Sequence, residues 1–140
     1  MPFQNEANLR NKNTSQTGQG VLGFGDVTTI ATAGAVTYTA RQILDGLILR
    51  DPNGAGRSDV SPTATQIIAE IQAPRVGEFF EFDVRNTADA AETITLTAGT
   101  GVTLSGTMTI AQNNSKRFRA QITGVATPAV TIYSVGTFVH

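Results

Sequence analysis

The sequence contains no cysteine and no tryptophan, and its single histidine is the last residue, His140. The lack of cysteine excludes disulfide bonds, thiolate zinc sites and cysteine nucleophiles. One terminal imidazole cannot complete a metal cluster or a Ser-His-Asp triad on its own. Chemistry that depends on these residue types is therefore not expected from this chain.

Charged residues are also scarce, at 15 % of the sequence, with 10 Lys and Arg against 11 Asp and Glu. A protein that binds nucleic acid through its phosphates needs a basic patch, so we expect no nucleic-acid partner. Thr, Ser, Asn, Gln and Gly must then cover much of the surface. Such a surface suits β structure and lateral packing against neighbours.

Long apolar stretches are missing as well. No run approaches the roughly 18 apolar residues of a membrane span, so we expect no membrane partner. Residues 1–20 are polar and lack the apolar core of a secretory signal peptide.

Residues 1–25 are predicted to form an extended N-terminal arm. Asn, Gln and Gly dominate this segment, and few apolar groups are available to offset the entropy of ordering it. A segment of this kind orders on a partner, or it is an untethered terminus without a role. The candidate contact residues in the arm are its isolated apolar side chains and two basic ones: Phe3, Leu9, Arg10, Lys12, Val21, Leu22 and Phe24.

Residues 26–140 are predicted to form one β-rich body, and 140 residues suffice for one domain with a core. Between residues 79 and 122 every second residue is apolar in several short runs, which predicts a β-meander. Residues 27–32 and 36–40 are expected to form a hairpin around Ala33-Gly34-Ala35. The apolar run 47–51 predicts a buried strand, and 129–137 the last strand.

One helix is predicted after Ser61 and Pro62, which suit the cap and the first helical position. Its apolar stripe recurs at three- and four-residue steps through Ala64, Ile67, Ile68 and Ile71. The expected fold is therefore mainly β: an antiparallel β-sandwich or small barrel, including a jelly roll, with one short helix and the extended N-terminal arm.

Three motifs superficially suggest chemistry. Residues 18–23 match G-x-G-x-x-G, but neither a preceding strand nor a following helix is expected, so a hinge is favoured over a dinucleotide site. The turn after Asp51 lacks the ligand spacing of a calcium loop. Glu81 and Asp83 imitate a hydrolase pair without a suitable acid beside them. We predict no catalytic residues, no cofactor and no metal.

Charged side chains alternate along two predicted strands. Glu81, Asp83 and Arg85 share one face of the first, and Lys116, Arg117 and Arg119 cluster on the second. If the strands are neighbours, these residues form cross-strand pairs. The alternative is a charged contact surface for another subunit.

The segment from residue 41 onward resembles a module of tailed-phage and other viral structural proteins. The residues that carry the resemblance are 47–55, 82–88, 92–96, 101–107 and 131–136. With its short length and polar arm, the whole chain is similar to a capsid decoration (cement) protein. The resemblance implies a β-rich knob, commonly trimeric, over capsid symmetry axes, with an arm that reaches across neighbouring capsid subunits.

The predicted function is thus that of a non-enzymatic virion structural protein, made in the host cytoplasm, that binds the outer capsid as an oligomer and stabilises the head. The expected partners are the major capsid protein and the chain itself, as a homotrimer. The alternative is a receptor- or glycan-binding knob of a head fibre or tail. Two tyrosines and no tryptophan offer little for stacking on sugars.

Overall fold

The structure is a computed structural model, and it describes residues 24–140. Its elements are β1 (Val27–Ile30), α2 (Ala40–Asp45), β2 (Leu47–Arg50), β3 (Arg57–Val60), α3 (Ala64–Glu70), β4 (Phe79–Asn86), β5 (Ile94–Thr97), β6 (Val102–Ser105), β7 (Thr109–Ile110), β8 (Asn114–Gly124) and β9 (Ala129–Val139). The predicted mainly β class is confirmed.

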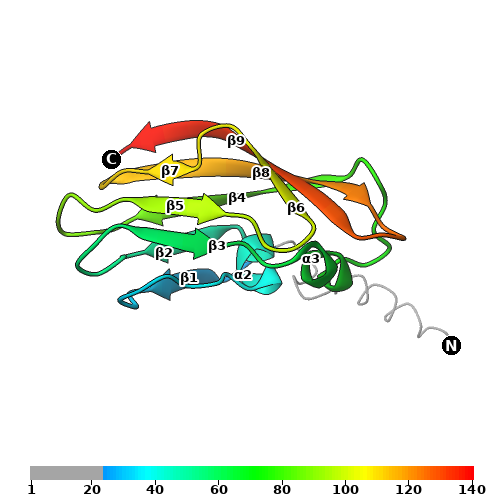
Figure 1. Cartoon of the computed structure of the whole chain (residues 1–140), viewed down its shortest axis with the longest axis horizontal. Helices are drawn as coiled ribbons and strands as arrows, with labels where there is room; N and C mark the ends of the chain where they lie inside the picture. The colour runs from blue at the N-terminus through cyan, green and yellow to red at the C-terminus, as the bar shows by residue number, and fades with distance from the viewer. Residues whose placement is uncertain (1–23) are drawn as a thin grey trace, which may run out of the picture.

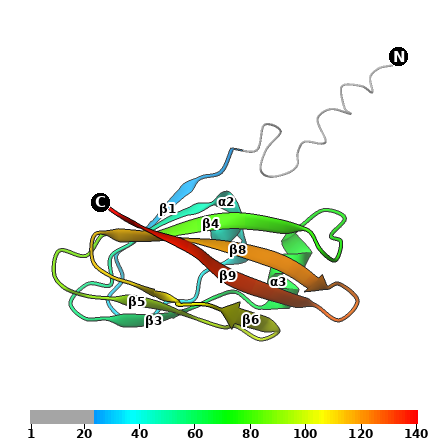
Figure 2. The ribbon, with the colours of Figure 1, turned by 90° about the horizontal axis from the view of Figure 1, so that it is seen from above.

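The strands form two sheets that pack face to face (Figures 1 and 2). The larger sheet has the order β1-β2-β4-β8-β9-β6, and the smaller has the order β3-β5-β7. Each sheet has free edges, which favours the predicted sandwich over the small barrel. Both sheets are mixed and not antiparallel throughout as predicted, because β1–β2, β2–β4, β3–β5 and β6–β9 pair in parallel. Parallel neighbours need crossover connections, and α2 lies in the connection between β1 and β2.

The core lies between the two sheets and follows the period of two along each strand. Phe82 and Phe118 stack at a centroid distance of 5.2 Å on the inner face of the larger sheet. Ile94, Leu96 and Ile110 meet them from the smaller sheet, and all five side chains are at most 2 % exposed.

Two helices, rather than the one predicted, lie near one end of the described body (Figure 1). Each begins with a capping box, through Thr39 and Gln42 in α2 and through Thr63 and Gln66 in α3. The start predicted at Ser61 is therefore wrong by two residues: the Ser61 hydroxyl accepts a hydrogen bond from the Gly99 amide instead.

The apolar stripe predicted for this helix is confirmed. Ala64 and Ile67 are fully buried, and Ile68 and Ile71 pack against the core while partly exposed.

The predicted strand pairings are wrong in two places. Residues 27–30 and 36–40 form no hairpin, because β1 pairs with β2 and residue 40 already begins α2. The predicted meander contains strands but not consecutive pairs: β5 belongs to the smaller sheet, and β4 pairs with β8. Alternation identifies strands and their inner faces, whereas long-range contacts select the partners.

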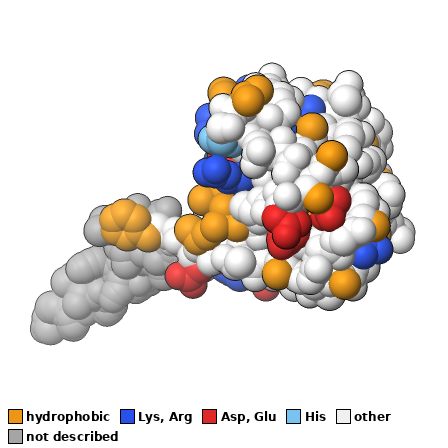
Figure 3. Space-filling view, turned by 90° about the vertical axis from the view of Figure 1, so that its left-hand side faces the viewer, with side chains coloured by type: hydrophobic (Ala, Val, Ile, Leu, Met, Phe, Trp, Pro, Cys, Tyr) orange, Lys and Arg blue, Asp and Glu red, His pale blue; other side chains and the backbone are white. Residues whose placement is uncertain are grey.

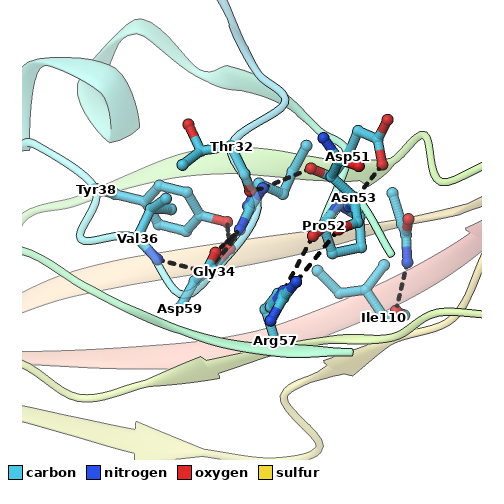
Figure 4. A network of polar contacts seen from close by, with 12 residues as sticks. Thr32, Gly34, Val36, Tyr38, Asp51, Pro52, Asn53, Arg57, Asp59 and Ile110 are labelled. Carbon is cyan, nitrogen blue, oxygen red and sulfur yellow. Dashed lines mark hydrogen bonds and ion pairs between the residues drawn. The ribbon is translucent and has the colours of Figure 1, made fainter. Parts of the chain in front are cut away.

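A buried ion pair connects the two sheets. Arg50 on β2 donates through Nε to Asp59 Oδ2 on β3 at 2.7 Å, and both side chains are fully buried. The remaining guanidinium donors reach Asp59 Oδ1 and the carbonyls of Thr32, Gly34 and Asp51. Figure 4 shows Thr32, Gly34, Asp51 and Asp59 as parts of one network of polar contacts. Every Arg50 N–H is thus satisfied, which is the condition for burying such a charge.

Tyr38 completes this network and gives it a pH dependence. Its hydroxyl donates to Asp59 Oδ2 at 2.8 Å. Burial, followed by the charge of Asp59, raises the pKa of Tyr38 well above its ordinary value of 10.0. Unfolded chains lose this proton near pH 10 while the folded protein keeps it, so the free energy of unfolding should fall as pH rises above about 10.

Tyr38→Phe should reduce this fall in the free energy of unfolding at alkaline pH. At neutral pH the variant should be less stable by about 1 kcal/mol, because it lacks the hydrogen bond. Urea unfolding at about pH 9 and about pH 11 measures the difference. Tyr133→Phe, at the other tyrosine, removes a hydroxyl from an exposed side chain and is the matched control. An equal alkaline slope in wild type and Tyr38→Phe would contradict the assignment.

Candidate docking face

The outer surface of the larger sheet carries the most distinctive side chains of the described body. Residues that alternate with the core side chains of β4 and β8 point outward. The register places them in rows across the strands: Phe79–Gln121–Thr131, Glu81–Arg119–Tyr133, Leu47–Asp83–Arg117–Gly136 and Leu49–Arg85–Ser115–Phe138. The rows make one continuous face, here called the outer face.

Two ion pairs occupy the centre of the outer face. Arg117 donates to both carboxylate oxygens of Asp83, at 2.8 and 2.9 Å. Arg119 lies opposite Glu81 and donates from Nε at 2.9 Å. The hydrogen bond and the charge of Asp83 raise the pKa of Arg117. The predicted cross-strand charge pairs are therefore confirmed for Glu81, Asp83, Arg117 and Arg119. Lys116, which was predicted to belong to the same cluster, is buried and forms no ion pair with a described residue.

Aromatic rings flank both arginines. The Cζ atom of Arg119 lies 4.6 Å from the ring centroid of Phe79, and that of Arg117 lies 5.6 Å from Phe138. Both distances are within the range of cation–π attraction. Phe79 and Phe138 nevertheless remain 56 % and 46 % exposed. Each ring holds its arginine in place and still offers a free side to a partner.

Arg85 distinguishes this face from a fully paired surface. It lies between Leu49 and Ser115 in the rows, and it makes no ion pair with any residue in the described range. Val27 and Leu47, on β1 and β2, form an apolar border beside the charged centre. Figure 3 shows hydrophobic and basic side chains together along this side of the molecule.

An apolar groove of about 660 Å³ continues from the outer face at Phe79. Its walls come from Leu44 of α2, from Phe80 of β4 and from the segment between α3 and β4, including Ile71 and Val76. Val76 is 64 % exposed. An Arg75–Glu78 ion pair of 2.7 Å lies at its rim, where the hydrogen bond from Arg75 lowers the pKa of Glu78. The volume is that of a site for a small ligand or a few side chains.

The arm candidates are almost all outside the described residues. Phe3, Leu9, Arg10, Lys12, Val21 and Leu22 lie in the part of the chain that is not described. Phe24 is described and is 76 % exposed. The next residue, Gly25, packs so closely on the carbonyl of Asp45 that no side chain would fit there. Asp45 follows Leu44, so the described chain begins close to the groove.

Sequence reasoning missed the outer-face aromatic residues and the groove. Phe79 was visible as an outward position of the alternating run, but Phe138 falls after the predicted end of the last strand. The groove is formed by Leu44, Ile71 and Phe80, which are far apart in sequence, so no local sequence pattern connects them.

Within residues 24–140, no group of three or more His, Asp or Glu side chains is placed to hold a metal ion. Among residues 24–140, no helix has the length and apolar character needed to cross a bilayer.

Comparisons with family models, with curated proteins and with solved structures find no match to this chain.

Proposed function

We propose that this protein is a non-enzymatic virion structural protein that binds the outer surface of a capsid as an oligomer and stabilises the head. The observation that carries the proposal is the outer face. Exposed aromatic rings and arginines are the residue types enriched at protein–protein interfaces, and they provide most of the binding energy there. The resemblance of residues 41–140 to viral structural modules supports a capsid as the partner.

The charges of the outer face specify the partner surface further. Glu81 and Asp83 are already paired, so their burial against a capsid leaves no carboxylate without a partner. Arg85 is half-exposed and makes no ion pair with any described residue. A capsid surface that presents a carboxylate opposite Arg85 and apolar side chains opposite Phe79 is the complement of this face.

The arm supplies the second contact of the proposed mechanism. A segment ordered on binding covers a large surface with weak contacts, and repetition over a symmetric lattice converts weak contacts into strong retention. The described chain begins beside the groove, which supports a mechanism in which the arm and the outer face contact the same capsid surface.

Deletion of residues 1–25 is expected to leave the body folded and to abolish capsid binding. Every described strand and helix begins after residue 25, which is why the thermal midpoint should be retained. The measurement is cosedimentation with capsids stripped of accessory proteins. Saturable binding by the full chain and normal binding by the truncated chain would show that the arm is not required.

Two point variants test the outer face separately. Phe79→Ser and Arg85→Glu should each weaken capsid binding by about tenfold or more, as expected for an interface anchor and a reversed charge. Thr109→Ala, on the exposed side of the smaller sheet, is the control and should bind normally. Normal capsid binding by both outer-face variants would show that another surface of the protein contacts the capsid.

The groove favours one second candidate, a receptor- or glycan-binding knob. It is concave, and two aromatic residues, Phe79 and Phe80, line it. A glycan-array screen of the full chain tests this candidate. The receptor- or glycan-binding knob would be favoured if the wild type binds a defined glycan, Phe79→Ser does not bind it, and the wild type does not bind capsids.

A further inference from the structure

The C-terminal half of β9 is an unprotected sheet edge. β6 pairs with β9 only from Val130 to Tyr133, whereas β9 continues to Val139. The loop after β6 contacts Ser134 through Gly106. Beyond that point β9 has β8 on one side and no described strand on the other. In Figure 1 this half of β9 runs along the upper edge of the sheet to the C-terminus.

The direction of the backbone groups follows from the ladder with β8. In an antiparallel pair, every second residue turns its N–H and C=O away from the partner strand. The amide of His140 donates to the carbonyl of Asn113, toward the β8 side. Residues in phase with His140 face β8, so Thr137 and Val139 face the open edge. Neither makes a backbone hydrogen bond to the rest of the described chain on that side.

The side chains of this edge do not discourage pairing. Residues 134–139 contain no charge and no proline, although natural sheet edges are usually protected by lysine, proline, bulges or covering segments. The bulge opposite Arg117 and Phe118 precedes residue 136, so the last four residues pair regularly. Val135 and Val139 are 50 % and 80 % exposed. The edge therefore offers both free hydrogen-bonding groups and apolar surface.

We propose that β9 pairs with β9 of a second copy of this chain, antiparallel and about a two-fold axis beside Phe138. A second copy fits because the edge is uncharged and meets its own image without repulsion. In this register Thr137 of each copy exchanges backbone hydrogen bonds with Val139 of the other, and the two Phe138 rings meet across the axis. The contact is isologous and closes after two copies.

The pairing joins the two larger sheets into one continuous sheet. Their outer faces then lie on the same side, which doubles the surface available to a common partner. The contact itself does not depend on capsid binding. The trimer implied by the resemblance needs a different contact between subunits. The molar mass in solution therefore distinguishes the proposed dimer from a trimer.

Light scattering of the full-length protein tests the proposal. We expect a mass of about twice the 14.7 kDa of one chain. Thr137→Pro removes an amide that faces the partner, and Val139→Lys places a charge on the edge, so both variants should be monomeric. Thr109→Lys introduces the same charge at β7, an edge strand of the smaller sheet, and should leave the mass unchanged. Circular dichroism confirms that each variant is folded.

Cross-linking tests the register. Because the chain has no cysteine, Phe138→Cys introduces a single thiol that lies opposite its own copy across the proposed axis. Oxidised glutathione should convert this variant to a covalent dimer, whereas Tyr133→Cys, exposed on the same strand but far from the axis, should remain uncross-linked. A monomeric wild type, or an oligomer whose mass survives both edge variants, would overturn the proposal.

Discussion

Asp59→Ala should destabilise the protein by about 3–5 kcal/mol, which is the usual cost of removing one partner from a buried ion pair. Burial opposes the charged form of Arg50, but the hydrogen bond and charge of Asp59 more than compensate and raise the pKa of Arg50. Without Asp59, a charged guanidinium with 0 % exposure keeps only three carbonyl partners. Val36 and Tyr38 also lose the carboxylate to which they donate. The thermal midpoint should fall by about 10–20 °C.

The matched control is Asp83→Ala, which removes the carboxylate of an exposed Arg117 pair on the outer face. Surface pairs contribute little, so this variant should melt close to the wild type. The double variant Arg50→Met/Asp59→Leu should be more stable than Asp59→Ala, because no buried charge is left unpaired. Equal melting of Asp59→Ala and Asp83→Ala would show that the buried pair does not hold the sheets together.

Arg50 also illustrates what the sequence did not reveal. The run from Leu47 to Arg50 predicts a buried strand, and the strand is present as β2. The alternation, however, places Ile48 and Arg50 in the interior and both leucines on the outer face. Only a partner from another sheet makes an inward arginine acceptable. Asp59 is that partner, and nothing in its local sequence connects it to Arg50.

Asn86 makes the same point on the neighbouring strand β4, where it lies directly beside Arg50. Its amide donates to the carbonyls of Glu92 and Ile110, and its oxygen accepts from the Ala88 amide. It therefore ties β4 to the loop before β5 and to β7. An asparagine that follows an alternating run is typical of a turn, so its local sequence does not indicate a buried residue. Its buried role depends on carbonyls that only the complete fold brings together.

The strands were easier to predict than their partners. Period-two alternation depends on neighbouring residues, so the inner positions of β4 and β8 could be read directly from the sequence. Partner choice depends on crossovers and sheet assignment, which is why β5 was placed beside β4 although it belongs to the smaller sheet. The ion pairs Glu81–Arg119 and Asp83–Arg117 were predicted correctly, because the prediction required only that β4 and β8 be neighbours.

Ile67→Asp should destabilise the fold by at least about 3 kcal/mol. Ile67 is fully buried on α3, where it packs into the core between the sheets. The substitution removes a buried aliphatic side chain and also places an unpaired carboxylate there, and each change is costly alone. Ile71→Asp should cost less, because Ile71 is partly exposed and follows the last turn of the helix.

Thr65→Asp is the control on the same helix. Thr65 is exposed in the first turn of α3, where a negative charge interacts favourably with the free backbone amides. The same new carboxylate should therefore leave the thermal midpoint unchanged or raise it slightly. The expected order of midpoints, Thr65→Asp above Ile71→Asp above Ile67→Asp, follows burial and not helix position. A midpoint for Ile67→Asp equal to that of Thr65→Asp would mean that α3 does not pack on the core in solution.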